Sequence, residues 1–301
     1  MGNKTWTLAL AIAVTACNND VTGQLGGPGG GSGQNYGGNH VSITGPAGFG
    51  GATGAITADG QTGQLIINIR DFKFYSASDS STVPDFENVP KADQSGAAST
   101  TYTGPWDDKE IVATQLGSDH KPVYKNASGT TLTTHGKSYF DKWFSTVPNT
   151  NILQAIPLTL TKSADGSYQY DSQSGGPLSP GGMFFPIDDG TQYKTAFGNQ
   201  GMIHNYSFTG EIHTLFTYQG GETFHFSGDD DVFVFINNNL VINLGGIHSR
   251  EQADVSIDSL NLTKGSTYPL DFFYAERHKN ASNLLITTTL QLVVNTDIPV
   301  Y

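Results

Sequence analysis

The residues best suited to chemistry are three consecutive aspartates, Asp229, Asp230 and Asp231, which follow Gly228. Adjacent ionised carboxylates repel each other, so such a run at the end of a strand needs a cation, basic partners or full solvation. Calcium binds six to eight oxygen atoms from carboxylates, amides, backbone carbonyls and water. The run therefore indicates a calcium site, with solvated turn aspartates as the alternative. It is not an EF-hand, because the D-x-D-x-D-G spacing and the terminal glutamate are absent.

Histidine and glutamate side chains elsewhere are weaker candidates. Five of the eight histidines lie in the C-terminal third of the sequence: His204, His213, His225, His248 and His278. No H-E-x-x-H motif or close histidine pair occurs among them, which disfavours catalytic zinc. His248 and His278 are expected in loops, where an imidazole can donate a hydrogen bond to a ligand.

Hydrolytic chemistry has little support in the sequence. A glycosidase needs two acids facing each other across a cleft, for which Glu276 and the aspartate run are the candidates. Arg277, next to Glu276, is as compatible with an ion pair as with a ligand contact. No G-x-S-x-G element is present, and the only cysteine is Cys17. We therefore expect no enzyme activity, with a glycoside hydrolase as the weaker alternative.

The segments that must position these residues are predicted to be β-strands. Residues 223–227 alternate polar and aromatic side chains, which is typical of a half-buried strand. Two hairpins are predicted, because turn residues separate paired apolar runs: 158–161 with 168–170, and 232–236 with 240–244. Further strands are predicted at 65–69, 270–274 and 284–294, and one helix at 136–144. The pattern predicts an all-β fold, an antiparallel sandwich or barrel with long loops.

Composition supports this interpretation and excludes one class of partner. The 301 residues include 37 glycines, and only 14% of them are charged. Long helical patterns are absent, which suits a turn-rich extracellular β protein. The formal net charge of −12 would repel nucleic-acid phosphates, so nucleic acid is excluded as a partner.

The N-terminal region predicts secretion and a lipid anchor. An apolar run from Trp6 to Ala16 ends at Cys17, which resembles a bacterial lipoprotein signal, with an ordinary secretory signal as the alternative. We expect residues 1–17 to be this signal, residues 18–63 to be a Gly-rich flexible tether, and residues 64–301 to be the β domain. Lipidation of Cys17 would attach the protein to a membrane through acyl chains alone. The expected location is the cell surface, as an outer-membrane lipoprotein, or the extracellular space.

Eight short segments, in order along the folded part, resemble a known family. They are Arg70-Asp71-Phe72, Pro84-Asp85-Phe86-Glu87, Lys121-Pro122-Val123-Tyr124, Phe184-Phe185-Pro186-Ile187-Asp188, His204-Asn205-Tyr206, Gly228 to Asn237, Leu244-Gly245-Gly246-Ile247-His248 and Ala275-Glu276-Arg277-His278. Together they are similar to the fibro-slime domain, which is related to the protective-antigen-type carbohydrate-binding β-barrels. The resemblance covers about residues 65 to 293 and implies a barrel of that type.

The resemblance also implies a function and a set of site residues. In sugar-binding members of the family, two aspartates joined by a cis peptide coordinate calcium, which in turn binds sugar hydroxyls. Asp229 and Asp230 match those aspartates, and Asn283 is the candidate for a further ligand from a later loop. Asp231, His248, Glu276 and His278 are expected to contact the ligand, and the motifs do not identify the glycan.

These inferences combine into one expected function. The sequence predicts a surface lipoprotein that binds a glycan or polysaccharide through Ca²⁺, for adhesion or attachment to extracellular matrix. The alternative is a structural subunit of a matrix or filament, in which calcium only makes the loop rigid. Exposed strand edges could then pair with neighbouring chains, so self-association is left open.

Overall fold

The structure is a computed structural model that describes residues 55–56, 62–86, 106–190, 192–290 and 292–293. All of them belong to one compact unit, residues 39–301. The expected signal with Cys17 and most of the expected tether lie outside the described residues. Within the described ranges, no helix has the length and apolar character needed to cross a membrane.

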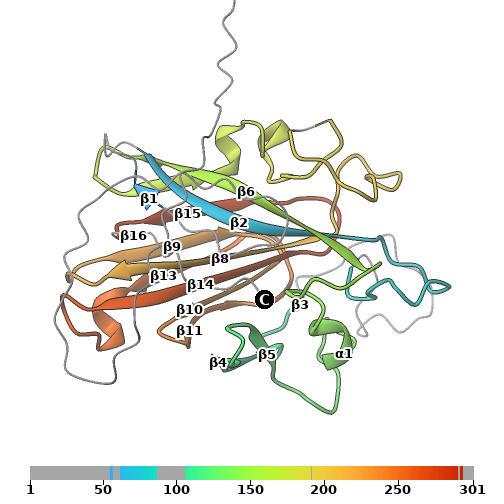
Figure 1. The fold of residues 1–301 in the computed structure, drawn as a ribbon, viewed down its shortest axis with the longest axis horizontal. Helices are drawn as coiled ribbons and strands as arrows, with labels where there is room; N and C mark the ends of the chain where they lie inside the picture. Colours follow the sequence, from blue (N-terminus) through green and yellow to red (C-terminus); the bar gives the residue numbers. More distant parts are fainter. Residues whose placement is uncertain (1–54, 57–61, 87–105, 191, 291, 294–301) are drawn as a thin grey trace, which may run out of the picture. The chain divides into compact units, whose positions relative to one another are not determined.

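Antiparallel strands are the main regular structure of the described chain, as the sequence predicts (Figure 1). The strands are β1 (Ala55–Ile56), β2 (Thr62–Phe72), β3 (Trp106–Asp107), β4 (Val112–Leu116), β5 (Pro122–Tyr124), β6 (Asn151–Lys162), β7 (Tyr168–Asp171), β8 (Phe208–Thr217), β9 (Thr223–Gly228), β10 (Asp231–Ile236), β11 (Asn239–Leu244), β12 (Gly246–Ile247), β13 (Glu251–Ser256), β14 (Thr267–Glu276), β15 (Leu284–Thr288) and β16 (Leu292–Val293). The helices are short: α1 (Lys137–Phe140) and the 3-10 turns η2 (Ser172–Ser174), η3 (Pro180–Gly182) and η4 (Ile257–Leu260). The all-β fold class is confirmed.

One large sheet follows the order β13-β9-β15-β7-β6-β2-β8-β14-β10-β11-β4-β5, and β1 and β16 pair with β2 and β8 (Figure 1). β12 and β3 form a separate pair. This order has a direct consequence for the aspartate run. β9 and β10, which flank it along the chain, belong to different parts of the sheet, so the run connects them.

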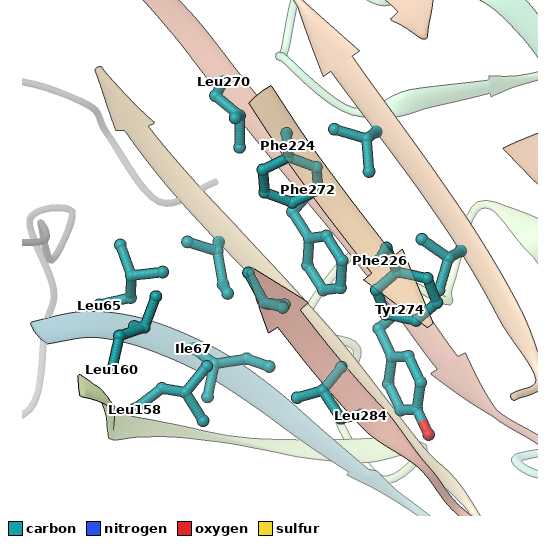
Figure 2. Close-up of a cluster of buried hydrophobic side chains, with 14 of the residues drawn as sticks. Leu65, Ile67, Leu158, Leu160, Phe224, Phe226, Leu270, Phe272, Tyr274 and Leu284 are labelled. Atoms are coloured by element: carbon teal, nitrogen blue, oxygen red, sulfur yellow. The ribbon is translucent and has the colours of Figure 1, made fainter. Parts of the chain in front are cut away.

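Two hydrophobic clusters cover opposite faces of β10 and β14. Val232 and Val234 face the main core, which Figure 2 shows around Phe226, Phe272 and Tyr274. Phe233 and Phe235 face a second cluster, which the region of α1 completes: Phe72, Val83, Phe86, Ile111, Val112, Tyr124, Phe140, Trp143, Phe144, Phe273 and Ala275. Because both faces are covered, β10 after Asp231 is an unbroken apolar run instead of an alternating one.

Both predicted hairpins are confirmed. In the β10–β11 hairpin, Asn237 and Asn238 have φ values of 51° and 64°, the left-handed conformation that asparagine tolerates in tight turns. In the β6–β7 hairpin, Thr161 pairs with Gln169.

Two predicted elements differ from the structure. The helix predicted at 136–144 is regular only over α1, which ends at Phe140, and Trp143 lies in the turn that follows; both side chains pack in the second cluster. The strand predicted at 284–294 is divided, because β15 pairs with β9 and β7 whereas β16 pairs with β8. In each case tertiary contacts override the local pattern.

A buried charged network connects the sheet to the region of α1. Glu211 on β8 is fully buried, with Oε1 2.9 Å from Arg70 Nη1 and Oε2 3.2 Å from Lys121 Nζ. His213 Nδ1 lies 2.7 Å from Asp271 Oδ1, and His213 Nε2 lies 3.6 Å from Glu211 Oε2. Burial alone would raise the pKa of Glu211, but the charge of Arg70, together with His213 and Lys121, lowers it to about 2. Burial alone would lower the pKa of His213, but the hydrogen bonds to Asp271 and Glu211 raise it to about 9.

We expect His213 to make stability fall in mildly alkaline solution. Its folded pKa of about 9 exceeds its ordinary value of 6.5, so its contribution is complete below pH 6.5 and disappears as the pH rises through 9. The free energy of unfolding should fall by about 3 kcal/mol over this range, since each pH unit between the two pKa values corresponds to about 1.4 kcal/mol. Urea unfolding at pH 6.5, 8 and 9.5 measures it, with His213→Gln as the comparison that lacks this titration. An imidazole pKa below 7 for His213, titrated by NMR, would contradict the prediction.

Candidate functional site

The aspartate run meets the loop after β14 through direct contacts between Asp229 and Asn283. The Asp229 carboxylate accepts hydrogen bonds from both Asn283 nitrogens, the backbone N and Nδ2, the latter at 2.9 Å. Gly228 permits this approach, because a Cβ at that position would collide with the carbonyl oxygen of Asn283. Asp229 is only 3% exposed, and burial raises the pKa of its carboxyl against the effect of these hydrogen bonds.

The backbone directly after β14 holds the Asp230 carboxylate in place. Its Oδ2 accepts hydrogen bonds from the backbone N atoms of Arg277 and His278, at 3.1 and 3.0 Å. The peptide bond between Asp229 and Asp230 is cis, as the family resemblance implies. Burial raises the pKa of Asp230 well above its ordinary value, and the neighbouring aspartates add to this rise against the charge of Arg277. Asp229, Asp230 and Asn283 therefore come together in the structure.

Asp231 has a different role from the ligand contact that we predicted. It is 0% exposed and forms a two-point pair with Arg277, from Nε to Oδ2 at 2.5 Å and from Nη2 to Oδ1 at 3.0 Å. Gly246 N donates to Oδ1 as well, at 2.7 Å. The structure thus places Asp231 inside the protein as the partner of Arg277, away from any surface that a ligand could reach.

Arg277 links this site to the region of α1. Its guanidinium donates to the carbonyl oxygens of Asp85 and Thr133, at 3.2 and 3.0 Å. It also lies over the ring of Trp143, 4.6 Å from the centroid. An ion pair with the adjacent Glu276 is compatible with the sequence, but the charged partner of Arg277 is Asp231, which lies 46 residues away along the chain.

Glu276 is fully buried beneath the aspartates instead of lining a surface. Its Oε2 accepts a hydrogen bond from Tyr274 at 3.1 Å, whereas Oε1 has no hydrogen-bond partner. Burial, together with the charges of Asp230 and Asp229, raises the pKa of Glu276 well above its ordinary value. The site therefore concentrates carboxylates for which the described residues supply few positive charges.

The two predicted loop histidines are also mostly covered. His248 is 3% exposed, and its Nε2 lies 3.2 Å from the carbonyl oxygen of Leu244. His278 is 8% exposed, with Nδ1 3.1 Å from the carbonyl oxygen of Lys279. In the conformation described here, both rings mainly bond the backbone that shapes the loops.

The donor set at this site fits a hard cation better than a transition metal. Within the described residues, no group of three or more His, Cys, Asp or Glu side chains is arranged to hold a metal ion. Calcium, however, also accepts amide, carbonyl and water oxygens. Asp229 and Asp230 offer carboxylate oxygens, and rotation of the Asn283 amide would present its oxygen. These residues therefore fit a calcium ion that completes its shell with backbone carbonyls, water or ligand hydroxyls.

Some important residues were not found by sequence reasoning. The buried network around Glu211 and the partners of Arg277 were both missed. Their signal was present, because Arg70, Glu211 and Asp271 are charged residues inside otherwise apolar strands. Such residues are buried only when they are paired.

Part of the chain is similar to a known domain family and to proteins of Dictyostelium discoideum. The PA14 domain model matches residues 163–298. Protein psiD of Dictyostelium discoideum is 43% identical over 188 residues, which cover 60% of this chain and 36% of psiD. Protein psiQ of the same organism is 38% identical over 194 residues, covering 61% of this chain and 19% of psiQ. The chain thus spans well under half the length of these relatives.

One solved structure is described as a PA14 sugar-binding domain from an RTX adhesin. It is 14% identical and covers 31% of this chain and 52% of its own, with a TM-score of 0.23. The matched family region includes the aspartate run, β14 and the Asn283 loop, which are the elements that form the candidate site. A PA14 domain is found in residues 163–298, in agreement with the protective-antigen-type resemblance of the motifs.

Proposed function

We propose that this protein is a calcium-dependent carbohydrate-binding module that serves adhesion or attachment to a polysaccharide matrix. The observation that carries the proposal is the convergence of Asp229, Asp230 and Asn283. These residues come from two loops 54 residues apart and meet at one end of the sheet. The PA14 domain across the same region supports the proposal, because the family resemblance implies sugar-binding members.

The protein's own residues prepare this site before any ligand arrives. The backbone donors of Arg277 and His278 hold Asp230 on one side, and Asn283 holds Asp229 on the other. Holding the groups in place reduces the entropy cost of binding. Asp229 and Asp230 crowd two carboxylates together in a buried place, and a divalent cation would relieve their mutual repulsion. Bound calcium would supply coordination positions for neighbouring sugar hydroxyls.

The proposed partner is a glycan or polysaccharide outside the cell, at the cell surface or in the extracellular space. Attachment to a membrane through lipidated Cys17 remains a prediction, because that residue lies outside the described residues. Binding is favoured over hydrolysis by the site itself. Glu276, which the glycosidase hypothesis needs as a catalytic acid, is 0% exposed.

Replacing Asp230 with asparagine should abolish calcium-dependent sugar binding. The amide oxygen of asparagine can still accept the backbone hydrogen bonds from Arg277 and His278, so the loops should keep their arrangement. Calcium affinity should fall about tenfold or more, because affinity follows the number of charged ligands. With chelator present, the variant should be at least as stable as the wild type, since a buried like-charge contact is removed.

Titration calorimetry with calcium, and glycan-array binding with calcium or chelator, provide the measurements. Asp165→Asn is the matched control, because it removes the same charge from an exposed turn far along the chain. Sugar binding that persists unchanged in chelator would refute the proposed function, as would an Asp230→Asn variant that binds like the wild type.

A further inference from the structure

An open cavity of about 420 Å³ lies on the outer side of the sheet, next to the aspartate run. Its lining residues are His225, Ser227, Arg250, Glu251, Gln252 and Leu285. They come from β9, β15 and the start of β13, which are neighbours in the sheet, and Arg250 directly precedes β13. Phe224 and Phe226, which alternate with His225 and Ser227, point into the core. The volume is in the usual range for small-ligand sites.

Arg250 is the unusual member of this lining. The sequence has three arginines, and the other two, Arg70 and Arg277, are 0% exposed. Arg250 is partly exposed, and its Nε donates to Ser227 Oγ at 2.8 Å, which fixes the side chain. No carboxylate among the described residues lies within ion-pair distance of it. A guanidinium has five N–H donors and no acceptor, so its free edge suits a carboxylate or sulfate.

The other lining groups suit sugar hydroxyls. His225 Nδ1 bonds Asp254 Oδ1 at 2.7 Å, which orients the ring and leaves Nε2 available. Gln252 is exposed and offers both a donor and an acceptor. Glu251 is the one acid in the lining, and Lys109 Nζ lies 3.3 Å from its Oε2, which offsets its charge. A cavity of this kind combines one anion-binding group with several groups that bind hydroxyls.

The cavity and the candidate calcium site are adjacent. Ser227, which holds Arg250, is two residues before Asp229, and Glu251 pairs with Gly228 across the sheet. The positive charge of Arg250 also opposes the rise in the pKa of Asp229, so the two groups are within electrostatic reach. One oligosaccharide could therefore contact both places.

We propose that this cavity is an anion-binding subsite, in which Arg250 binds the carboxylate or sulfate of an acidic saccharide. The inference rests on the proposed sugar-binding function and narrows it to charged glycans. An acidic sugar would otherwise be repelled by a protein of net charge −12, so a fixed guanidinium beside the site would decide which glycans bind.

Matched sets of methyl glycosides test the inference by calorimetry or NMR titration in calcium. Each set shares one ring, from glucose, galactose or mannose, and includes the neutral hexose, the hexuronic acid and the 6-sulfated hexose. In at least one set, an acidic member should bind about tenfold tighter than the neutral member, because charge-assisted hydrogen bonds are stronger. Arg250→Gln should remove this difference without weakening the neutral sugar. Lys264→Ala, an exposed lysine beyond the opposite end of β9, is the control for charge alone.

The outcomes separate this inference from the proposed function. A preference for uronic acid alone identifies a carboxylate ligand, and equal preference for the sulfated ring identifies a general anion subsite. If neutral and acidic members bind equally in every set, the subsite is overturned. If that binding also requires Asp230, the proposed function remains intact. A preference that survives Arg250→Gln would overturn it as well. If no member of any set binds the wild type, the subsite is refuted, and a glycan array negative in calcium would refute the proposed function too.

Discussion

Replacing Arg277 with methionine is expected to lower the free energy of unfolding by about 3–5 kcal/mol, because a buried acid loses its partner. Asp231 is 0% exposed, and the guanidinium supplies two of its hydrogen bonds. Methionine fills similar space but donates no hydrogen bond. The carbonyl oxygens of Asp85 and Thr133 would lose their donor as well.

Urea unfolding measures this change, and a double variant provides its control. Arg277→Met combined with Asp231→Leu should recover part of the lost stability, because removing both members of a buried pair leaves no unpaired charge. A single variant that loses less than about 1 kcal/mol would contradict the structural role of the pair, since surface pairs contribute that little. Sugar binding gives a second readout. It should weaken in Arg277→Met even where the protein is folded, because the backbone N of Arg277 holds Asp230.

Replacing Glu211 with glutamine is expected to lower the free energy of unfolding by a similar amount, about 3–5 kcal/mol. Glu211 is fully buried and faces two cations, Arg70 and Lys121. The amide removes the charge that compensates them, and none of the Arg70 nitrogens has an aligned hydrogen-bond acceptor to replace it. The low folded pKa of Glu211, about 2, means that its contribution is complete above pH 4.5 and is lost as the pH falls towards 2.

A surface pair in the same protein is the matched control for Glu211. Glu110 Oε2 lies 2.6 Å from Lys125 Nζ, but these side chains are 70% and 46% exposed. Glu110→Gln should therefore change stability by less than about 1 kcal/mol. Equal effects of the two substitutions would show that the buried network does not hold the sheet to the region of α1. Acid unfolding adds a further check. Between pH 4.5 and 2 the free energy of unfolding should fall less steeply for Glu211→Gln than for the wild type.

Local patterns were enough to predict the β character of the chain and both hairpins. Asn237 and Asn238 indicate a turn whatever surrounds them, because few other residues tolerate positive φ. The aspartate run was also visible as a site, because repulsion between adjacent carboxylates is a local property. The single strand predicted at 284–294 is two strands in the structure, because its first half pairs with β9 and its second half pairs with β8, and both partners are distant along the chain.

The roles of the site residues needed the tertiary structure. The three aspartates look equivalent in sequence, yet Asp231 is paired with Arg277 while Asp229 and Asp230 meet backbone and amide groups of a later loop. The cavity around Arg250 could not be predicted either, because its lining comes from strands that become neighbours only through the order of the sheet.

By itself, the sequence determined the β character of the chain, its two hairpin turns and where negative charge accumulates, because these depend on residues close together along the chain. Only the tertiary structure decided which carboxylates are paired with cations in the interior and which bond the backbone and amide groups of a later loop. That division depends on burial and on partners that are distant along the chain, and both are set when the sheet packs against its two hydrophobic clusters.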